Sequence, residues 1–335
     1  MTELRFAVIG INHAHIYGQV DCLLRAGAGC VGFHAPEDDL AKLFAERHPQ
    51  IPHVAEKRRL LEDDKVKLIV SAGIPFERAP LGIEVMRHGK DYMSDKPGMT
   101  SLEQLAEVRR VQAETKRIYS ICYSEHFETR STVKAGELVT SGAIGKVINT
   151  VGLGPHKLKN LPRPDWFYRR EKTGGILTDI ASHQCEQFLF FADALDGKVV
   201  AASVANRANP ETPELQDIGE MMLRSGEVTG YVRVDWFTPD GLPVWGDGRL
   251  TILGTEGYIE LRKYIDVEGA PGIDHLLLVD RKGTRRIDCS GVELPYGRQL
   301  IADILERTET AMPQARCFKA IELALTAQAI AEGRA

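Results

Sequence analysis

The sequence predicts an α/β protein with two domains, the first built on a doubly wound parallel sheet and the second on a mostly antiparallel sheet. The chain has 335 residues, whereas a typical domain holds roughly 100–200. Short apolar strands alternate with helices up to residue 123, which is typical of parallel sheets with crossover helices. Beyond residue 123, strands follow one another through short turns, as in antiparallel sheets.

The first 123 residues show this alternation element by element. A continuous apolar run at 5–9 ends at Gly10 and predicts a buried parallel strand. A helix is predicted at 14–26, because apolar residues recur there at helical spacing and glycines follow. Further strands are predicted at 30–35, 66–73, 91–95 and 117–123, with helices beginning at Pro36 and Pro75 and covering about 102–115. We therefore expect a first domain over residues 1–123.

Residues 124–335 are expected to form the second domain. Strands are predicted at 147–154, 199–206, 219–225, 228–237, 249–254 and 258–263. Links such as 225–227 (Ser-Gly-Glu) are short enough for antiparallel hairpins. Helices are predicted near 129–140, 175–194, 298–309 and 316–332.

Composition and charge argue against several classes of protein. The net charge of −5 lacks the basic excess that is typical of nucleic-acid binders. No apolar run approaches the ~18 residues of a membrane-spanning helix, and the N-terminus lacks the pattern of a secretory signal peptide. The six cysteines are scattered without a C-x-x-C pair, so no disulfide framework is expected. We expect a soluble, cytoplasmic protein without nucleic-acid or membrane partners.

The turn after the first predicted strand is the place where a doubly wound sheet binds a dinucleotide. Helix N-termini offer unpaired N–H groups and a positive dipole end to a pyrophosphate. The usual G-x-G-x-x-G fingerprint is reduced here to its first glycine, and the candidate contacts are Gly10, Ile11, Asn12 and His13. Asn12 and His15 stand where the other two glycines are usual. An ordinary strand–helix turn would explain the same residues.

The acidic residue that commonly binds the ribose of a dinucleotide is also displaced. It is expected about 20 residues after the glycines, at the end of the second strand. Ala35 occupies that position, and Glu37 and Asp38, which lie just beyond it, are the candidate substitutes. No arginine directly follows the strand to bind a 2′-phosphate. Both NAD and NADP therefore stay open, with NAD slightly favoured.

Two segments carry groups suited to proton and charge chemistry. Lys96 lies in Asp95-Lys96-Pro97 at the carboxyl end of a predicted strand, where open α/β sheets bind ligands. Asp179 and His183 are four residues apart on a predicted helix, so about 5–6 Å would separate their Cβ atoms. A carboxylate at that distance can fix the tautomer of an imidazole and favour its protonated form. The alternatives are a solvated strand-end lysine and a helix-surface ion pair.

These motifs resemble those of the Gfo/Idh/MocA oxidoreductases. The stretch 95–97 looks like the Glu-Lys-Pro motif of that family, and 174–183 resembles its G-G-x-L-x-D-x-x-x-H helix. The resemblance covers nearly the whole chain and includes Ile74-Pro75, 141–145 (Ser-Gly-Ala-Ile-Gly) and 254–257 (Gly-Thr-Glu-Gly). It implies a Rossmann domain that binds NAD or NADP, followed by an α/β domain with a large, open, mostly antiparallel sheet.

The resemblance also implies roles for individual residues. His183 would act as general acid/base, Asp179 would orient it, and Lys96 would hold the reacting oxygen. Beside the turn residues, the implied cofactor contacts are Gly73, Ile74, Asp95 and Lys96. The candidate substrate contacts are Tyr123, His156, Trp166 and Arg169.

The expected reaction is hydride transfer between the nicotinamide and a hydroxyl or keto carbon of a polyol, sugar or sugar-acid-like substrate. By resemblance, the protein is expected to form a homodimer or homotetramer. The alternatives are an NAD-dependent glycoside-cleaving enzyme and a ligand sensor without turnover. The H-x-H spacing of His13 and His15 also suggests a metal-dependent hydrolase, but the repeats of a barrel are absent, so no metal is expected.

Overall fold

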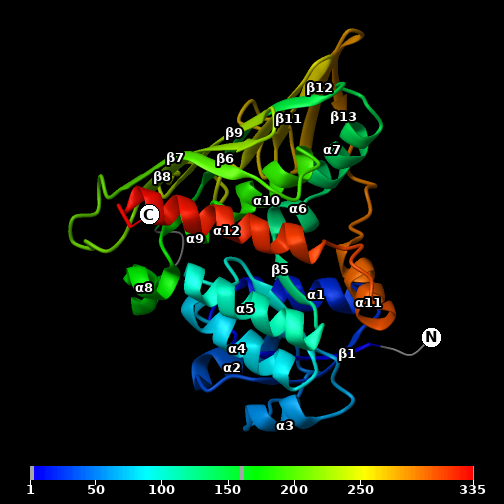
Figure 1. Ribbon diagram of the computed structural model, residues 1–335, viewed down its shortest axis with the longest axis vertical. Coiled ribbons are helices and arrows are strands. Elements are labelled where there is room, and N and C mark those ends of the chain that lie inside the picture. Colours follow the sequence, from blue (N-terminus) through cyan, green and yellow to red (C-terminus); the bar gives the residue numbers. More distant parts are fainter. Residues whose placement is uncertain (1–3, 159–161, 335) are drawn as a thin grey trace. The chain divides into compact units, whose positions relative to one another are not determined.

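The computed structural model describes residues 4–158 and 162–334 and divides into two compact units (Figure 1). The first unit comprises Met1–Cys122 and Pro295–Phe318, and the second comprises Tyr123–Leu294 and Lys319–Ala335. Among the described residues, none of the helices is both long enough and apolar enough to span a membrane.

The first unit is built on a five-stranded parallel sheet in the order β2-β1-β3-β4-β5. The strands are β1 (Arg5–Ile9), β2 (Gly29–His34), β3 (Leu68–Ser71), β4 (Asp91–Asp95) and β5 (Tyr119–Cys122). The helices are α1 (His15–Arg25), α2 (Asp38–Arg47), α3 (Lys57–Glu62), α4 (Pro75–Arg87), α5 (Leu102–Thr115) and α11 (Tyr296–Glu306). The predicted doubly wound parallel sheet is confirmed. From β1 the chain first adds β2 on one side and then β3 on the other, and such folds bind ligands at this switch in strand order.

Residues 295–318, assigned from the sequence to the second domain, group with this first unit. Two of their side chains form hydrogen bonds with residues of the edge strand β5. The Tyr296 hydroxyl lies 2.8 Å from Ser120 Oγ. Gln314 accepts a hydrogen bond from the backbone N–H of Tyr119 (2.9 Å) and donates one to its carbonyl (3.2 Å). An otherwise unpaired sheet edge is thereby hydrogen-bonded.

Asp303 fixes the turn that follows α11. Its carboxylate accepts hydrogen bonds from the backbone N–H groups of Thr310 and Ala311, both at 2.8 Å, and from the hydroxyls of Thr308 and Thr310. Burial alone would raise the pKa of Asp303, but the hydrogen bonds outweigh it and hold this pKa below its usual value.

We expect Asp303→Ala to lower the free energy of unfolding by about 2–4 kcal/mol, because at least two backbone donors lose their acceptor. A depressed carboxyl pKa stabilises the fold above the unfolded-state value near ~3.9, and this contribution is lost as the pH falls toward the folded-state pKa. The destabilisation should therefore be largest at neutral pH and smaller in acid. Urea unfolding at several pH values measures it, and the exposed Glu306→Ala on the same helix should have little effect. A loss that does not change with pH would contradict the role of the charge.

The second unit is built on an eight-stranded sheet in the order β13-β12-β11-β10-β6-β9-β8-β7. Its strands are β6 (Val147–Pro155), β7 (Lys198–Ala205), β8 (Ile218–Ser225), β9 (Val228–Asp235), β10 (Arg249–Gly254), β11 (Gly257–Arg262), β12 (His275–Asp280) and β13 (Gly283–Ile287). Neighbouring strands are antiparallel except β6 and β9, which are parallel. The prediction of a large, mostly antiparallel, open sheet is confirmed.

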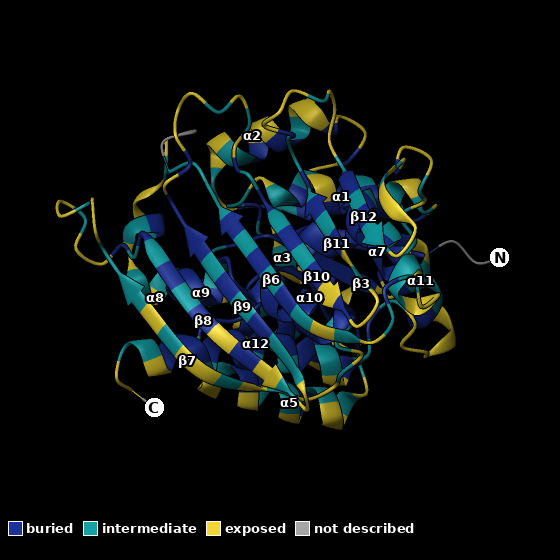
Figure 2. Ribbon diagram, turned by 90° about the horizontal axis from the view of Figure 1, so that it is seen from above, coloured by how far each residue is buried: buried dark blue, intermediate teal, exposed yellow. Residues whose placement is uncertain are grey.

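Helices cover one face of this sheet. They are α6 (Ser124–Phe127), α7 (Arg130–Thr140), α8 (Arg170–Thr173), α9 (Ile176–Asp179), α10 (Ser182–Phe191) and α12 (Gln314–Ala331). In Figure 1 the described helices of the unit lie on one side of the strands, with α10 against β6. Figure 2 shows the other face, where buried residues alternate with partly buried and exposed ones along β8, β9 and β10. This alternation is typical of a sheet with one covered face.

The structure differs from the prediction at two places in the second unit. The long helix expected at 175–194 is divided into α9 and α10, with Ile180 and Ala181 between them. The edge strand β13 and its neighbour β12 were not predicted. β13 (Gly283–Ile287) carries two arginines and no buried residue, so it lacks the apolar pattern of a strand and forms through its pairing with β12.

Candidate active site

The turn after β1 is held tightly against the end of β3. Gly10 has a φ of +81°, and a Cβ added there would lie 3.2 Å from the Cα of Gly73. His13 N–H donates to the carbonyl of Ala72 (2.9 Å), and the Ala72 N–H donates to the carbonyl of Gly10 (3.0 Å). The close approach requires glycine at position 10. The structure thus brings together two of the predicted cofactor contacts, Gly10 and Gly73.

A cavity of about 360 Å³ lies at the carboxyl ends of β1, β2 and β3. Among the residues that line it are Gly10, Asn12, Glu37, Lys57, Gly73 and Leu81. Its size falls in the range of roughly 300–1,000 Å³ that is typical of small-molecule sites, and its place is the usual ligand site of an open α/β sheet.

Glu37 presents a carboxylate to this cavity. The residue stands at the N-cap position of α2, and Asn12 Nδ2 donates to its Oε1 at 2.7 Å. Its other oxygen, Oε2, is buried and has no hydrogen-bond partner among the described residues. Lys57, also on the cavity wall, is paired with Glu84 at 2.6 Å. A carboxylate two residues beyond Ala35 therefore lines the cavity.

A charged cluster surrounds Asp95 at the end of β4. His15 Nδ1 lies 3.0 Å from Asp95 Oδ1, His13 Nδ1 lies 3.6 Å from Oδ2, and Arg78 Nη2 lies 3.2 Å from Oδ2. Burial alone would raise the pKa of Asp95, but His15, Arg78 and His13 outweigh it and hold this pKa far below its usual value. Burial, together with His15, lowers the pKa of His13 well below the usual value. Asp95 is therefore a carboxylate at neutral pH.

Arg78 was not singled out from the sequence, although it organises this end of the sheet. The side chain is 1% exposed. Its Nε donates to the carbonyl of Gly73 (2.8 Å), and Nη1 donates to the carbonyl of Lys96. Lys96 itself is buried. One guanidinium thus binds the ends of β3 and β4.

His13, His15 and Asp95 are residue types that also bind metal ions in proteins. Their ligating atoms lie within 4.8 Å of one another, and two imidazoles with a carboxylate are common zinc ligands. However, Asp95 is already compensated by Arg78. The sheet that carries the cluster is also open, whereas the metal-dependent hydrolase alternative requires a closed barrel. The ion-pair network explains the cluster without a metal.

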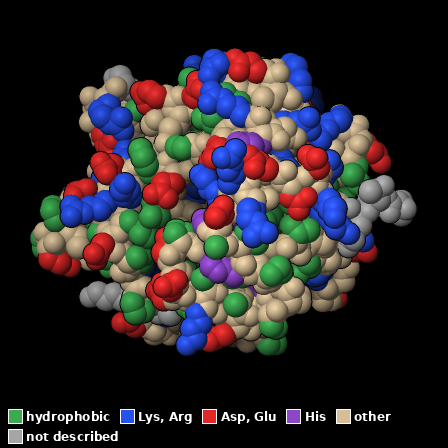
Figure 3. All heavy atoms as spheres, turned by 90° about the horizontal axis from the view of Figure 1, so that it is seen from below, with side chains coloured by type: hydrophobic (Ala, Val, Ile, Leu, Met, Phe, Trp, Pro, Cys, Tyr) green, Lys and Arg blue, Asp and Glu red, His purple; other side chains and the backbone are tan. Residues whose placement is uncertain are grey.

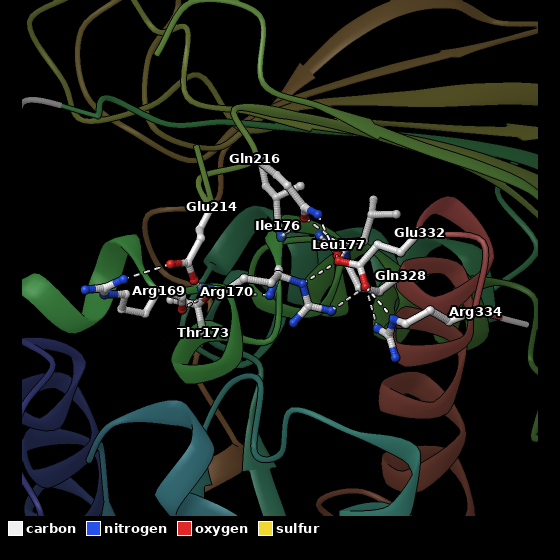
Figure 4. A network of polar contacts seen from close by, with 11 residues as sticks. Arg169, Arg170, Thr173, Ile176, Leu177, Glu214, Gln216, Gln328, Glu332 and Arg334 are labelled. Atoms are coloured by element: carbon white, nitrogen blue, oxygen red, sulfur yellow. Dashed lines mark hydrogen bonds and ion pairs between the residues drawn. The ribbon is translucent and has the colours of Figure 1, made fainter. Parts of the chain in front are cut away.

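In the second unit, α9 begins at two glycines in a backbone conformation that suits only glycine. Gly174 and Gly175 have φ values of +84° and +86°, and a Cβ at Gly175 would lie 2.5 Å from the side chain of Gln328. The backbone N–H groups that open α9 are bound by side chains from elsewhere (Figure 4). Ile176 N–H donates to Gln216 (3.2 Å), and Leu177 N–H donates to Gln328 (3.0 Å).

Asp179 and His183 lie on either side of the break between α9 and α10. Asp179 ends α9 and is partly exposed, whereas His183 is 2% exposed and its N–H donates to the carbonyl of Ile180. Asp179 lines a small cavity with Phe167 and Trp236, among others. Because the two residues lie on separate helices, their spacing of four does not by itself place them on one face.

The candidate substrate residues have different surroundings. Tyr123 is buried, with its ring centroid 6.2 Å from that of His183. His156 is partly buried and lies 4.6 Å from the Trp245 ring. Trp166 is partly exposed in a short 3₁₀ helix, Asp165–Tyr168, and Arg169 is exposed and paired with Glu214 at 2.8 Å. Tyr123 therefore lies beside the predicted catalytic histidine.

Figure 3 shows one face of the molecule, on which acidic and basic side chains are interspersed. This distribution agrees with the small net charge of −5. The basic side chains on that face do not form the continuous stripe that is typical of a nucleic-acid binder.

Comparisons with known proteins agree on the type of protein. Residues 132–260 match the model of the GFO/IDH/MocA C-terminal domain. A crystal structure of a protein from Erwinia carotovora atroseptica SCRI1043, provisionally described as an oxidoreductase, is 45% identical, with 98% of this chain and 99% of that chain covered and a TM-score of 0.95.

More distant relatives have named substrates. A D-xylose dehydrogenase from Paenarthrobacter nicotinovorans is 23% identical over 208 residues, which are 61% of this chain and 52% of the relative. The chain therefore spans about half the length of this curated relative. A levoglucosan dehydrogenase in complex with NADH and levoglucosan is 17% identical over 99% of this chain and 97% of that chain, with a TM-score of 0.79, a likeness of fold.

Proposed function

The chain belongs to the GFO/IDH/MocA family of oxidoreductases, and we propose that it is a NAD-dependent dehydrogenase of polyols, sugars or sugar acids. The observation that carries this proposal is the cavity at the carboxyl ends of β1, β2 and β3. The bound nicotinamide would accept or donate the hydride. The substrate class is proposed by analogy with the sugar substrates that two relatives are named for.

The residues around the cavity fit a dinucleotide. Gly10 has a positive φ, and a Cβ there would lie 3.2 Å from the Cα of Gly73. The N-terminus of α1 supplies a positive dipole end for a pyrophosphate. Buried, unpartnered Glu37 Oε2 is an acceptor for the ribose hydroxyls. By the same resemblance, Ile11, Asn12, His13, Ile74, Asp95 and Lys96 are proposed as further contacts.

The position of Glu37 favours NAD over NADP. A 2′-phosphate would bring a second anion against the Glu37 carboxylate, whose Oε2 is buried, and this is electrostatically unfavourable. The cation on the cavity wall, Lys57, is engaged with Glu84 and is therefore not free to compensate a phosphate. NAD is also the cofactor that the sequence slightly favours.

The proposed proton transfer and charge stabilisation involve His183, Asp179 and Lys96. His183 would take the proton from the substrate hydroxyl during oxidation and return it during reduction, and Asp179 would orient His183 or the substrate. Lys96 would hold the reacting oxygen and stabilise its negative charge. Tyr123, His156, Trp166 and Arg169 are proposed to bind substrate hydroxyls, and the protein is proposed to act as a homodimer or homotetramer.

Nicotinamide fluorescence titrations test the cofactor site. We expect NADH to bind more tightly than NADPH, and Glu37→Gln to weaken NADH binding by about 10- to 100-fold, because a hydrogen bond to a charged group contributes about 1.5–3 kcal/mol. Glu37→Gln should also reduce the discrimination against NADPH. The control is Glu56→Gln, an exposed change outside the cavity lining. Failure of folded, cofactor-free protein to bind either form would overturn the dehydrogenase proposal, and tighter binding of NADPH would overturn the preference for NAD.

A further inference from the structure

A fully buried ion pair lies beside the helix that carries His183. Lys263 Nζ and Glu125 Oε2 are 2.6 Å apart, and the side chains are 1% and 3% exposed. Glu125 lies on α6 and Lys263 directly follows β11, 138 residues later. Removing two charges from water is costly, and an apolar pair of similar volume is often no less stable. A contribution to stability therefore does not explain why this ion pair is buried here.

Both members of the pair are bonded to α10. Lys263 Nζ also donates to Gln187 Oε1 (2.8 Å), and Gln187 Nε2 donates to the backbone carbonyl of His183 (3.1 Å). Gln184 Nε2 donates to Glu125 Oε2 at 3.1 Å. The network thus reaches the backbone of His183 on one side and the side chain of its neighbour on the other.

The neighbouring strand β6 is shaped to admit this network. A Cβ at Gly152 would lie 2.9 Å from Cγ of Gln184, and one at Gly154 would lie 3.0 Å from its Nε2. The two glycines lie two positions apart and therefore face the same side of the sheet. Together they accommodate the Gln184 side chain that reaches Glu125.

Electrostatics link the ion pair to His183. Burial alone would raise the pKa of Glu125, but Lys263, His183 and His156 outweigh it and lower this pKa to about 2. Glu125 is therefore an anion near His183 throughout the neutral range. Its Oε1 is buried and has no hydrogen-bond partner among the described residues. The other titratable groups on α10 and on the segments around it include Tyr123, His126, Glu128, Arg130, Lys134, Glu137, His156, Asp179, Cys185, Glu186 and Tyr264.

We propose that Glu125 and Lys263 are positioning residues for His183, which orient its helix and set the proton affinity of its imidazole. The inference rests on the proposed role of His183 as general acid/base. Loss of the Glu125 charge would leave the Lys263 cation unbalanced and disfavour a protonated His183. Loss of the Lys263 charge would leave the Glu125 anion unbalanced and favour a protonated His183. The two single changes therefore act in opposite directions.

Histidine NMR titration of the intact protein tests this inference without substrate. We expect Glu125→Gln to lower the pKa of His183 and Lys263→Met to raise it. Each shift should be on the order of one pH unit, which is the general effect of a unit charge at about 10 Å for an effective dielectric constant near 20. The double variant should return close to the wild-type value. The His183→Asn variant assigns the resonance, and Lys134→Met, which breaks the exposed Lys134–Glu137 pair on α7, is the matched control.

A purely structural role would give a different result. Loosening of the site would move the pKa of His183 in the same direction in both single variants, and that outcome would overturn the inference, as would an unchanged pKa in both. If one single variant does not fold, the pKa of His183 is compared between the other single variant and the double variant. A shift in that single variant that the double variant reverses would support the inference. Because the titration needs no turnover, absence of dehydrogenase activity would count against the proposed function alone.

Discussion

Replacing His183 by alanine is expected to lower kcat by about 10²- to 10⁴-fold, which is the usual contribution of a general acid/base. Hydride transfer to or from an alcohol carbon requires a proton to leave or reach its oxygen. His183 is 2% exposed, so bulk water cannot readily replace the imidazole. The affinity for NADH should change little, because the proposed cofactor contacts belong to other residues. Steady-state formation of NADH with a polyol or sugar found by screening measures the effect.

Two further variants sharpen this prediction. Lys96→Met should also lower kcat strongly, because the ammonium is proposed to stabilise charge on the reacting oxygen. His53→Ala, which removes an exposed histidine of the first unit, should leave kcat near the wild-type value. Near-full turnover by His183→Ala on the true substrate would show that another group transfers the proton.

The elements that the sequence predicts well are those in which local pattern and tertiary structure agree. Residues 6–9 of the run at 5–9 are buried in a parallel sheet, so its continuous apolar pattern is informative. The short link at 225–227 joins β8 and β9, which form the expected antiparallel hairpin. In both cases the residues close in sequence already contain the decisive information.

The features that could not be predicted depend on partners far away in the sequence. Helical periodicity continues through the break between α9 and α10, and the start of α9 is fixed by Gln216 and Gln328. Glu125 and Lys263 are each ordinary charged residues until the fold brings them together. The sequence offers both Glu37 and Asp38 as substitutes for the acid missing at Ala35, and the preference for Glu37 depends on its side-chain contact with Asn12.

Arg78 is the clearest case of such a residue, and its removal is expected to have the largest effect on stability. Arg78→Met should lower the free energy of unfolding by about 3–5 kcal/mol, because breaking a buried ion pair leaves an uncompensated charge. That charge is Asp95, which is 1% exposed. The carbonyls of Gly73 and Lys96 also lose their donor, so NADH binding should weaken as well. Urea unfolding and the fluorescence titration measure the two effects.

The pH dependence separates the charge of Arg78 from its packing. The pKa of Asp95 is depressed in the folded protein, so its contribution to stability is present above the unfolded-state value near ~3.9 and is lost as the pH falls toward the folded-state pKa. Arg78→Met should raise the pKa of Asp95, and the difference in stability from wild type should therefore be largest at neutral pH and shrink below about pH 4. Adding Asp95→Asn should recover part of the loss, and the exposed Arg87→Met on the same helix should cost little. An equal loss at neutral and acid pH would assign the effect to packing of the side chain, because only the ion pair depends on the ionisation of Asp95.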